Sequence, residues 1–168
     1  MALFASWSPG TAFMPAEFPA GGLGRVNGIP WTDVVGLRQS GGCTFQGQHG
    51  NSNWFHVPIS TPVIVSGVRA KLIQVFVMFQ CGDPNATIAS NAGANITDVH
   101  VWDGGSRIHM FGGFNLFGEH RFRLDTSTTF KMPVPNQDIF FGLELAVHVN
   151  FSQDQTITFS SAGADFDV

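Results

Sequence analysis

The sequence predicts an all-β protein, and within that class a single-domain β-sandwich of jelly-roll or Greek-key type. Apolar residues recur at a spacing of two or in short solid runs, and no segment shows sustained helical periodicity. Clusters of Gly, Pro, Asn and Asp divide the chain into about eight such segments, a number typical of sandwiches. A closed β-barrel is the alternative architecture, because it is built from the same short strands.

Two segments carry the strongest strand signals. Residues 72–79 are almost entirely apolar, which is typical of a central strand covered on both faces. Residues 139–151 alternate instead, with one apolar face and one mixed face that carries Glu144 and His148. Further strands are expected near residues 53–60, 96–102, 107–111, 120–124, 127–132 and 155–161, with a short last strand toward Phe166.

Residues 1–52 are rich in Gly and Pro and are expected to be irregular. They also contain the large apolar side chains Phe13, Phe18, Leu23, Ile29 and Trp31. This content favours chain packed on the body or on a neighbouring subunit over a disordered arm, which is normally poorer in aromatic residues. A length of 168 residues suits one core, so residues 1–168 are assigned to one domain.

The composition argues against two classes of partner. Charged residues make up 12% of the chain, and its eight Lys and Arg residues form no cluster larger than Arg121 with Arg123, which excludes nucleic acid. No apolar run reaches the roughly 18 residues of a membrane span. The N-terminal residues lack the pattern of a secretory signal, so a cytoplasmic location is expected, with Cys43 and Cys81 reduced. The low charge also favours a homo-oligomer with part of its surface covered.

The segment ITDVHVWDGGSRIHMF, residues 96–111, predicts a β-hairpin. Aligning the strands across its DGGS turn places His100 opposite His109, on the same side as Asp98. Opposed β-carbons lie about 4.5–5.5 Å apart, so these three side chains could hold a divalent metal such as zinc or iron. The plainer interpretation is a solvated sheet surface with no cofactor, since neither His-x-His nor His-Glu-x-x-His occurs in the chain.

The same alignment pairs Trp102 with Arg107, and Trp54 lies on an earlier strand. Trp54, Trp102 and Arg107 are the candidate ligand-binding residues, because aromatic faces stack on ligands and Arg anchors polar groups. His56 and His120 alternate with apolar residues and are interpreted as hydrogen-bonded structural histidines. The chain contains no Gly-x-Ser-x-Gly elbow and no phosphate-binding loop.

Three segments, NWFHVPISTPVIVSGVRAKL, ITDVHVWDG and SAGADF, resemble as a set an uncharacterised bacterial β-rich family known only as a domain of unknown function. The resemblance extends over roughly residues 54–168. It implies one compact domain in which His56, His100 and the stretch 118–120 fall within the motifs. It implies no activity, ligand or catalytic residue.

Two functional hypotheses follow. The first is a non-catalytic module that binds a small molecule, either a sugar or an apolar metabolite, or that assembles through its aromatic, charge-poor surface. The second is a metal-dependent enzyme centred on His100 and His109, with Asp98 as a candidate third ligand, which would activate water or dioxygen. The sequence does not decide between these two hypotheses, and therefore does not decide whether the protein is an enzyme.

Overall fold

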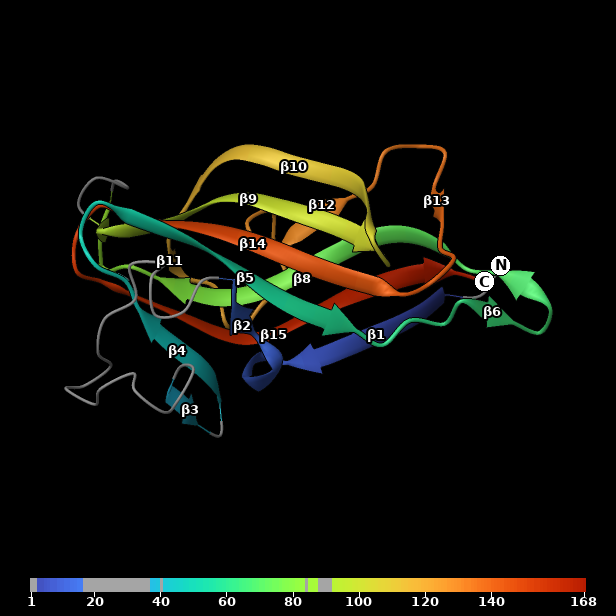
Figure 1. The fold of residues 1–168 in the computed structure, drawn as a ribbon, viewed down its shortest axis with the longest axis horizontal. Helices are drawn as coiled ribbons and strands as arrows, with labels where there is room; N and C mark the ends of the chain where they lie inside the picture. The colour runs from blue at the N-terminus through green and yellow to red at the C-terminus, as the bar shows by residue number, and fades with distance from the viewer. Residues whose placement is uncertain (1–2, 17–36, 40, 84, 88–91) are drawn as a thin grey trace.

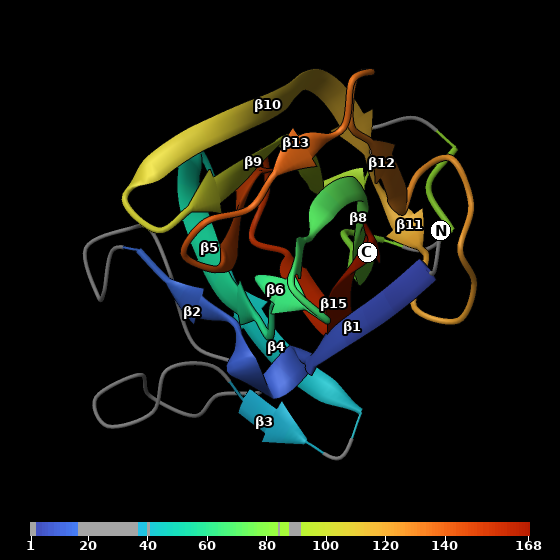
Figure 2. The same ribbon diagram turned by 90° about the vertical axis from the view of Figure 1, so that its right-hand side faces the viewer.

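The computed structural model describes residues 3–16, 37–39, 41–83, 85–87 and 92–168. The described strands form two antiparallel sheets that face each other across one core, together with a small two-stranded ribbon (Figures 1 and 2). The predicted all-β sandwich is confirmed, and the sheets are two separate layers instead of the closed barrel considered as the alternative. No helix among the described residues is long and apolar enough to cross a membrane.

The eight-stranded sheet is built around β8 and β15, and shorter strands flank these two. Its members are β1 (Leu3–Pro9), β3 (Leu37–Gln39), β4 (Gly42–Gln46), β8 (Lys71–Cys81), β11 (Gly118–Glu119), β12 (Thr129–Lys131), β13 (Gln137–Asp138) and β15 (Thr156–Asp167). The short strands β11, β12 and β13 pair in turn along one edge of β8. On the other side of β15, β4 pairs with its first half and β1 with its second half.

The five-stranded sheet has the strand order β10-β9-β14-β5-β2. These strands are β2 (Met14–Pro15), β5 (Asn51–Ile59), β9 (Ala94–Asp103), β10 (Ser106–Leu116) and β14 (Leu143–Phe151). The ribbon pairs β6 (Ile64–Val65) with β7 (Val68–Arg69), and a short 3-10 turn covers Gly10–Ala12. Figure 1 views the five-stranded sheet from its outer face, the side turned away from the eight-stranded sheet.

Strict alternation along β14 sends one set of side chains into the core and the other to the outer face. The inward side chains from Leu143 to Phe151 are at most 3% exposed, as the period-two pattern predicted. Phenylalanines dominate the core between the sheets; Phe13, Phe45, Phe55, Phe79, Phe151, Phe159 and Phe166 are all fully buried. Burial of such apolar area is the main stabilising contribution to a fold of this kind.

The solid apolar run in β8 is explained by burial on both faces. Phe76 and Met78 point away from the core yet are only 3% and 6% exposed. The ring of Trp7 on β1 stacks on Phe76 with the ring centroids 5.2 Å apart. It reaches Phe76 by passing over Gly163 of β15, where a Cβ atom would lie 2.7 Å from the indole. A glycine is therefore required at this crossing because any side chain would displace the indole.

The expectation that residues 1–52 are irregular is wrong for the described part, which contributes β1 to β4 and the start of β5. Phe13 is fully buried and stacks on Phe159 at 3.9 Å, so this part packs on the body as predicted. The predicted contributions of Phe18, Leu23, Ile29 and Trp31 lie outside the described residues.

Three strand boundaries also differ from the prediction. Residues 120–124 form turns and bends instead of a strand, and the two segments expected at 155–161 and near Phe166 are one strand, β15. β14 begins at Leu143 instead of 139, because the N–H groups of residues 140–142 donate to the Asp103 carboxylate instead of to a neighbouring strand.

Candidate ligand-binding face

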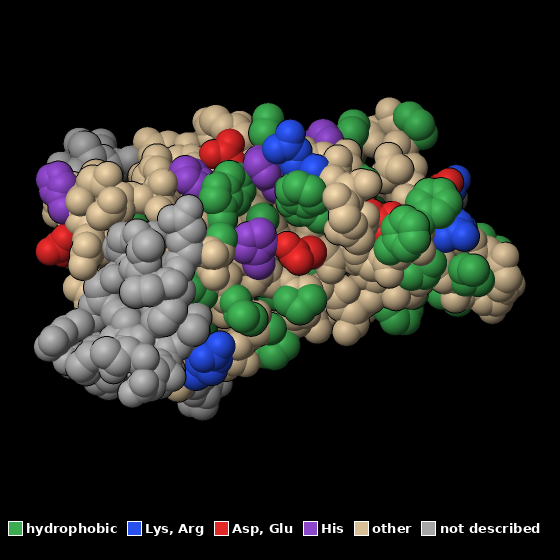
Figure 3. Space-filling view, viewed as in Figure 1, with side chains coloured by type: hydrophobic (Ala, Val, Ile, Leu, Met, Phe, Trp, Pro, Cys, Tyr) green, Lys and Arg blue, Asp and Glu red, His purple; other side chains and the backbone are tan. Residues whose placement is uncertain are grey.

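The register of the five-stranded sheet determines which side chains share its outer face. β14 lies between β9 and β5, so Ala146 has His100 on one side and His56 on the other. Trp102 lies opposite Glu144, and Trp54 lies opposite His148. Directly opposed residues project to the same side of a sheet. Figure 3 shows histidine, hydrophobic and acidic side chains gathered over these strands.

A hollow of about 320 Å³ opens on this face. Its lining residues are Ala16, Trp54, His56, His100, Trp102 and Ala146. Ala146, only 2% exposed, forms the floor at the middle strand. Four ring side chains surround it, two contributed by β5 and two by β9. A small residue among four rings leaves room for a ligand at the centre of the sheet, with aromatic walls to contact it.

The rings of the hollow also contact one another. The Trp54 indole lies 4.3 Å from the His100 imidazole and 4.7 Å from the His148 imidazole, measured between ring centroids. Because His100 is on β9 and His148 is on β14, the indole extends across β14 from its own strand, β5. These contacts hold the Trp54 ring in place, which reduces the entropy that a ligand would lose by ordering it.

Hydrogen bonds fix the polar groups at the rim. Nδ1 of His56 donates to Oε1 of Glu144 at 2.5 Å. Nδ1 of His148 lies 2.6 Å from the hydroxyl of Thr97. Within the part of the chain that the structure describes, the buried indole N–H of Trp102 has no hydrogen-bond acceptor. An unsatisfied buried donor is costly, and because this N–H is shielded, a molecule in the hollow does not contact it in this conformation.

Two imidazoles on this face are biased toward their neutral form. Burial lowers the pKa of His100, and the nearby Arg107 guanidinium lowers it further, against an opposing contribution from Asp98. Burial also lowers the pKa of His148, again opposed by Asp98. A neutral imidazole offers one N–H donor and one acceptor nitrogen. At neutral pH the face therefore presents rings with mixed hydrogen-bonding capacity and little positive charge.

The structure brings Trp54 and Trp102 together around one hollow, although they come from strands far apart in the sequence. Arg107 pairs with Trp102 as predicted, but it lies outside the lining of the hollow. Sequence reasoning missed His56 and Ala146 as site residues. In the sequence, both residues could be placed only on the mixed faces of their strands. The strand order was needed to show that these faces adjoin one another.

The predicted pairing of His100 with His109 is wrong. An irregularity between Arg107 and His109 shifts the register, so His100 faces Met110 and His109 faces Val101. Val101 is fully buried in the core, and the His109 ring contacts Phe111, which also packs against the core. The two imidazoles therefore lie on opposite faces of the sheet and cannot share an ion.

Asp98 does lie on the same face as His100, as predicted, but its nearest histidine partner is His148, with Oδ2 and Nδ1 3.7 Å apart. Among the described residues, no three His, Cys, Asp or Glu side chains are arranged to hold a metal ion. The zinc or iron site proposed from the sequence required His100 and His109 on one face of the sheet, and the structure does not have this arrangement.

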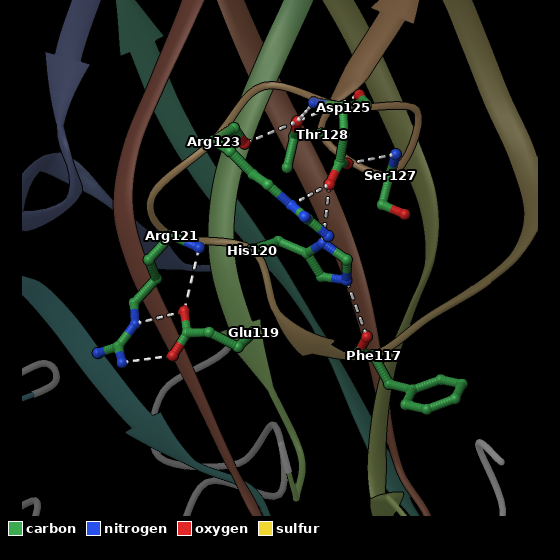
Figure 4. A network of polar contacts seen from close by, with 8 residues as sticks. All are labelled: Phe117, Glu119, His120, Arg121, Arg123, Asp125, Ser127 and Thr128. Carbon is green, nitrogen blue, oxygen red and sulfur yellow. Dashed lines mark hydrogen bonds and ion pairs between the residues drawn. The ribbon is translucent and has the colours of Figure 1, made fainter. Parts of the chain in front are cut away.

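A second polar cluster lies beside β8 (Figure 4). His120 donates from Nε2 to the carbonyl of Phe117 at 3.0 Å, and its ring packs on Phe79. Asp125 lies 3.6 Å from Nδ1 of His120 and accepts the backbone N–H of Ser127. These contacts hold the loop that leads from β11 to β12. His120 therefore has the contacts of a structural histidine.

No disulfide links Cys43 and Cys81, and both side chains are buried. Burial raises the pKa of the Cys43 thiol to about 11, against a small lowering by Arg38. Burial also raises the pKa of Cys81. Because the thiolate is the reactive form, neither residue is suited to act as a nucleophile.

The fold and the face together define a two-sheet β-sandwich with an aromatic hollow on one sheet. The chain belongs to a family of unknown function, DUF6623, whose model matches residues 32–161. This confirms the resemblance found in the sequence, with a match that begins earlier, at residue 32, and ends at residue 161, before most of the SAGADF motif. A search of curated proteins found no match. Among solved structures, a xylan-binding module, CBM15, is similar over 93% of this chain and 97% of that chain, with 12% identity and a TM-score of 0.41.

Proposed function

We propose that this protein is a non-catalytic binding module and that the hollow between Trp54 and Trp102 binds a sugar. The observation that carries the proposal is the arrangement of four rings around Ala146 on the outer face of the five-stranded sheet. Aromatic walls with a few placed polar groups are the usual composition of small-molecule sites.

A sugar fits this chemistry better than a purely apolar metabolite. A pyranose ring presents apolar C–H faces and a rim of hydroxyl groups, so it can stack on indole rings while its edge forms hydrogen bonds. The pair formed by His56 and Glu144 and the neutral imidazole of His100 add donors and acceptors at the rim.

The carboxylate spacing supports binding without hydrolysis. Glycosidases use two carboxyl groups about 5–9.5 Å apart. On the outer face, Asp98 lies in the row of His148 and Glu144 lies four residues away along β14. At about 3.3 Å per residue their backbones are roughly 13 Å apart. Glu144 is also held by His56, so among the described residues no two carboxylates with the spacing of an acid and a nucleophile line the hollow.

The test is affinity electrophoresis of the purified protein in gels that contain xylan, mannan or mixed-linkage glucan. We expect retardation by at least one polysaccharide, lost in Trp54→Ala and in Trp102→Ala. The matched control is Trp7→Ala, which removes an indole from the outer side of the other sheet. Equal retardation of all three variants, or retardation by none of a broad panel of sugars, would refute the proposal.

We also propose that the protein is a homo-oligomer, on the basis of its low charge and of exposed apolar side chains such as Phe141, Val134 and Ile64, which are at least 60% exposed. Light scattering at high protein concentration tests this separately. A strict monomer would contradict it without affecting the binding proposal.

A further inference from the structure

We infer that the binding face accommodates an extended oligosaccharide chain that runs along β14, with a second, amide-lined subsite at Asn95 and Asn150. The inference rests on the proposed function, because it takes the hollow at Ala146 as the first subsite. Its own basis is a second hollow on the same sheet.

This second hollow also measures about 320 Å³. It is lined by residues at the far end of β14 and by the neighbouring ends of β5 and β9, among them Ser52, Asn95 and Asn150. These three are one cross-strand row, because Asn150 lies opposite Ser52 on one side and opposite Asn95 on the other. Asn150 and Ser52 are exposed. Their amide and hydroxyl groups can donate and accept hydrogen bonds at the same time.

The two hollows lie in line along one strand. Glu144, Ala146, His148 and Asn150 all project from the outer face of β14, because alternate residues of a strand share a face. Trp54 lines the first hollow, and Ser52, two residues earlier on the same face of β5, lines the second. From Glu144 to Asn150 the track is six residues, or roughly 20 Å at 3.3 Å per residue.

The chemistry of the track suits a neutral polymer with repeated hydroxyl groups. The first hollow supplies ring faces, and the second supplies side-chain amides and hydroxyls without a Lys or Arg among its lining residues. Arg107 lies beside Trp102, at the opposite end of the track from Asn150, so a polyanion would meet no Lys or Arg among the described residues that line the second hollow. A short apolar ligand would use the first hollow alone.

The experiment is calorimetric titration with two ladders, xylo-oligosaccharides and cello-oligosaccharides, from disaccharide to hexasaccharide. We expect the hexasaccharide of one ladder to bind about tenfold more tightly than its disaccharide. The variant with Asn95→Ala and Asn150→Ala should lose about fivefold to tenfold in hexasaccharide affinity, as expected for two hydrogen bonds. Its affinity for the disaccharide should be unchanged, whereas Trp54→Ala should weaken both.

Asn115→Ala is the matched control, since Asn115 is an exposed asparagine on β10 outside both hollows. Thermal melts verify that each variant is folded. If disaccharide and hexasaccharide bind equally and the double variant matches Asn115→Ala, the extended track is refuted while the first hollow stands. If no member of either ladder binds the unmodified protein, both this inference and its first subsite are contradicted for these neutral sugars.

Discussion

Replacing Asp103 with Asn should destabilise the protein strongly, because its carboxylate organises the turn that leads into β14. Oδ2 accepts the N–H of Phe140 at 2.8 Å, and Oδ1 accepts the N–H groups of Phe141 and Gly142 at 2.8 and 2.9 Å. The side chain is buried, with 4% exposure. An amide can keep only the bonds to its single oxygen, and its NH2 group would then face a backbone N–H without an acceptor.

The magnitude follows from these three bonds. Hydrogen bonds to a charged group contribute about 1.5–3 kcal/mol each, and leaving a buried donor unpaired costs a further ~1–3 kcal/mol. One lost bond and two weakened ones give a loss of about 3–5 kcal/mol in the free energy of unfolding. For a chain of this size each kcal/mol lowers Tm by about 2–4 °C, so Tm should fall by roughly 10 °C.

Asp165→Asn is the matched control. Asp165 is similarly buried, at 9% exposure, but accepts one bond from the side-chain amide of Gln74, which an Asn oxygen can still accept. We expect a loss of about 1 kcal/mol or less. Urea denaturation monitored by circular dichroism measures both variants. Equal stability losses in the two variants, or a loss below about 1 kcal/mol for Asp103→Asn, would refute the reasoning.

Three further changes test other parts of the structure. The pKa values of His100 and His148 are lowered in the folded protein, so the unfolded chain binds protons first as the pH falls. Acid should therefore destabilise the fold below about pH 6.5. Measurements of Tm from pH 7.5 down to 5 check this, and a rise in Tm on acidification would contradict it. Gly163→Ala should lower the free energy of unfolding by about 1–3 kcal/mol, because the added methyl group displaces the Trp7 indole. Unchanged stability and unchanged indole fluorescence would show that Trp7 does not pack over Gly163. Phe13→Ala should cost about 3–5 kcal/mol in urea denaturation, whereas a negligible loss would show that residues before β3 do not pack on the core.

Local sequence patterns predicted the central strands well, because the burial of a strand face directly determines which of its residues are apolar. The alternation in β14 and the solid run in β8 each report which faces are covered. The N-terminal strand β1 was missed because its alternation runs opposite to the usual pattern: in LFASWSP the side chains of Ser6 and Ser8 are buried, whereas Trp7 is 44% exposed. Its pairing with β15 joins two ends of the chain, and such long-range partners leave no local signal.

The histidine pairing failed for a different reason. The alignment was correct for Trp102 with Arg107 and wrong from the next pair onward, because one extra residue at Ile108 shifts the register. A single-residue slip exchanges the two faces of a strand, so His109 moved to the core side. In contrast, the convergence of Trp54 and Trp102 depended on β14 lying between their strands, which the sequence alone did not reveal.

The most direct test of the proposed binding face is a titration followed by the indole N–H signals of the tryptophans in NMR spectra, assigned from single Trp→Phe variants. Upon addition of xylo- or cello-oligosaccharide, the signals of Trp54 and Trp102 should move together while that of Trp7 stays in place. If a saturating concentration of oligosaccharide leaves the Trp54 and Trp102 signals in place, or moves only the Trp7 signal, a sugar site on the outer face of the five-stranded sheet is contradicted.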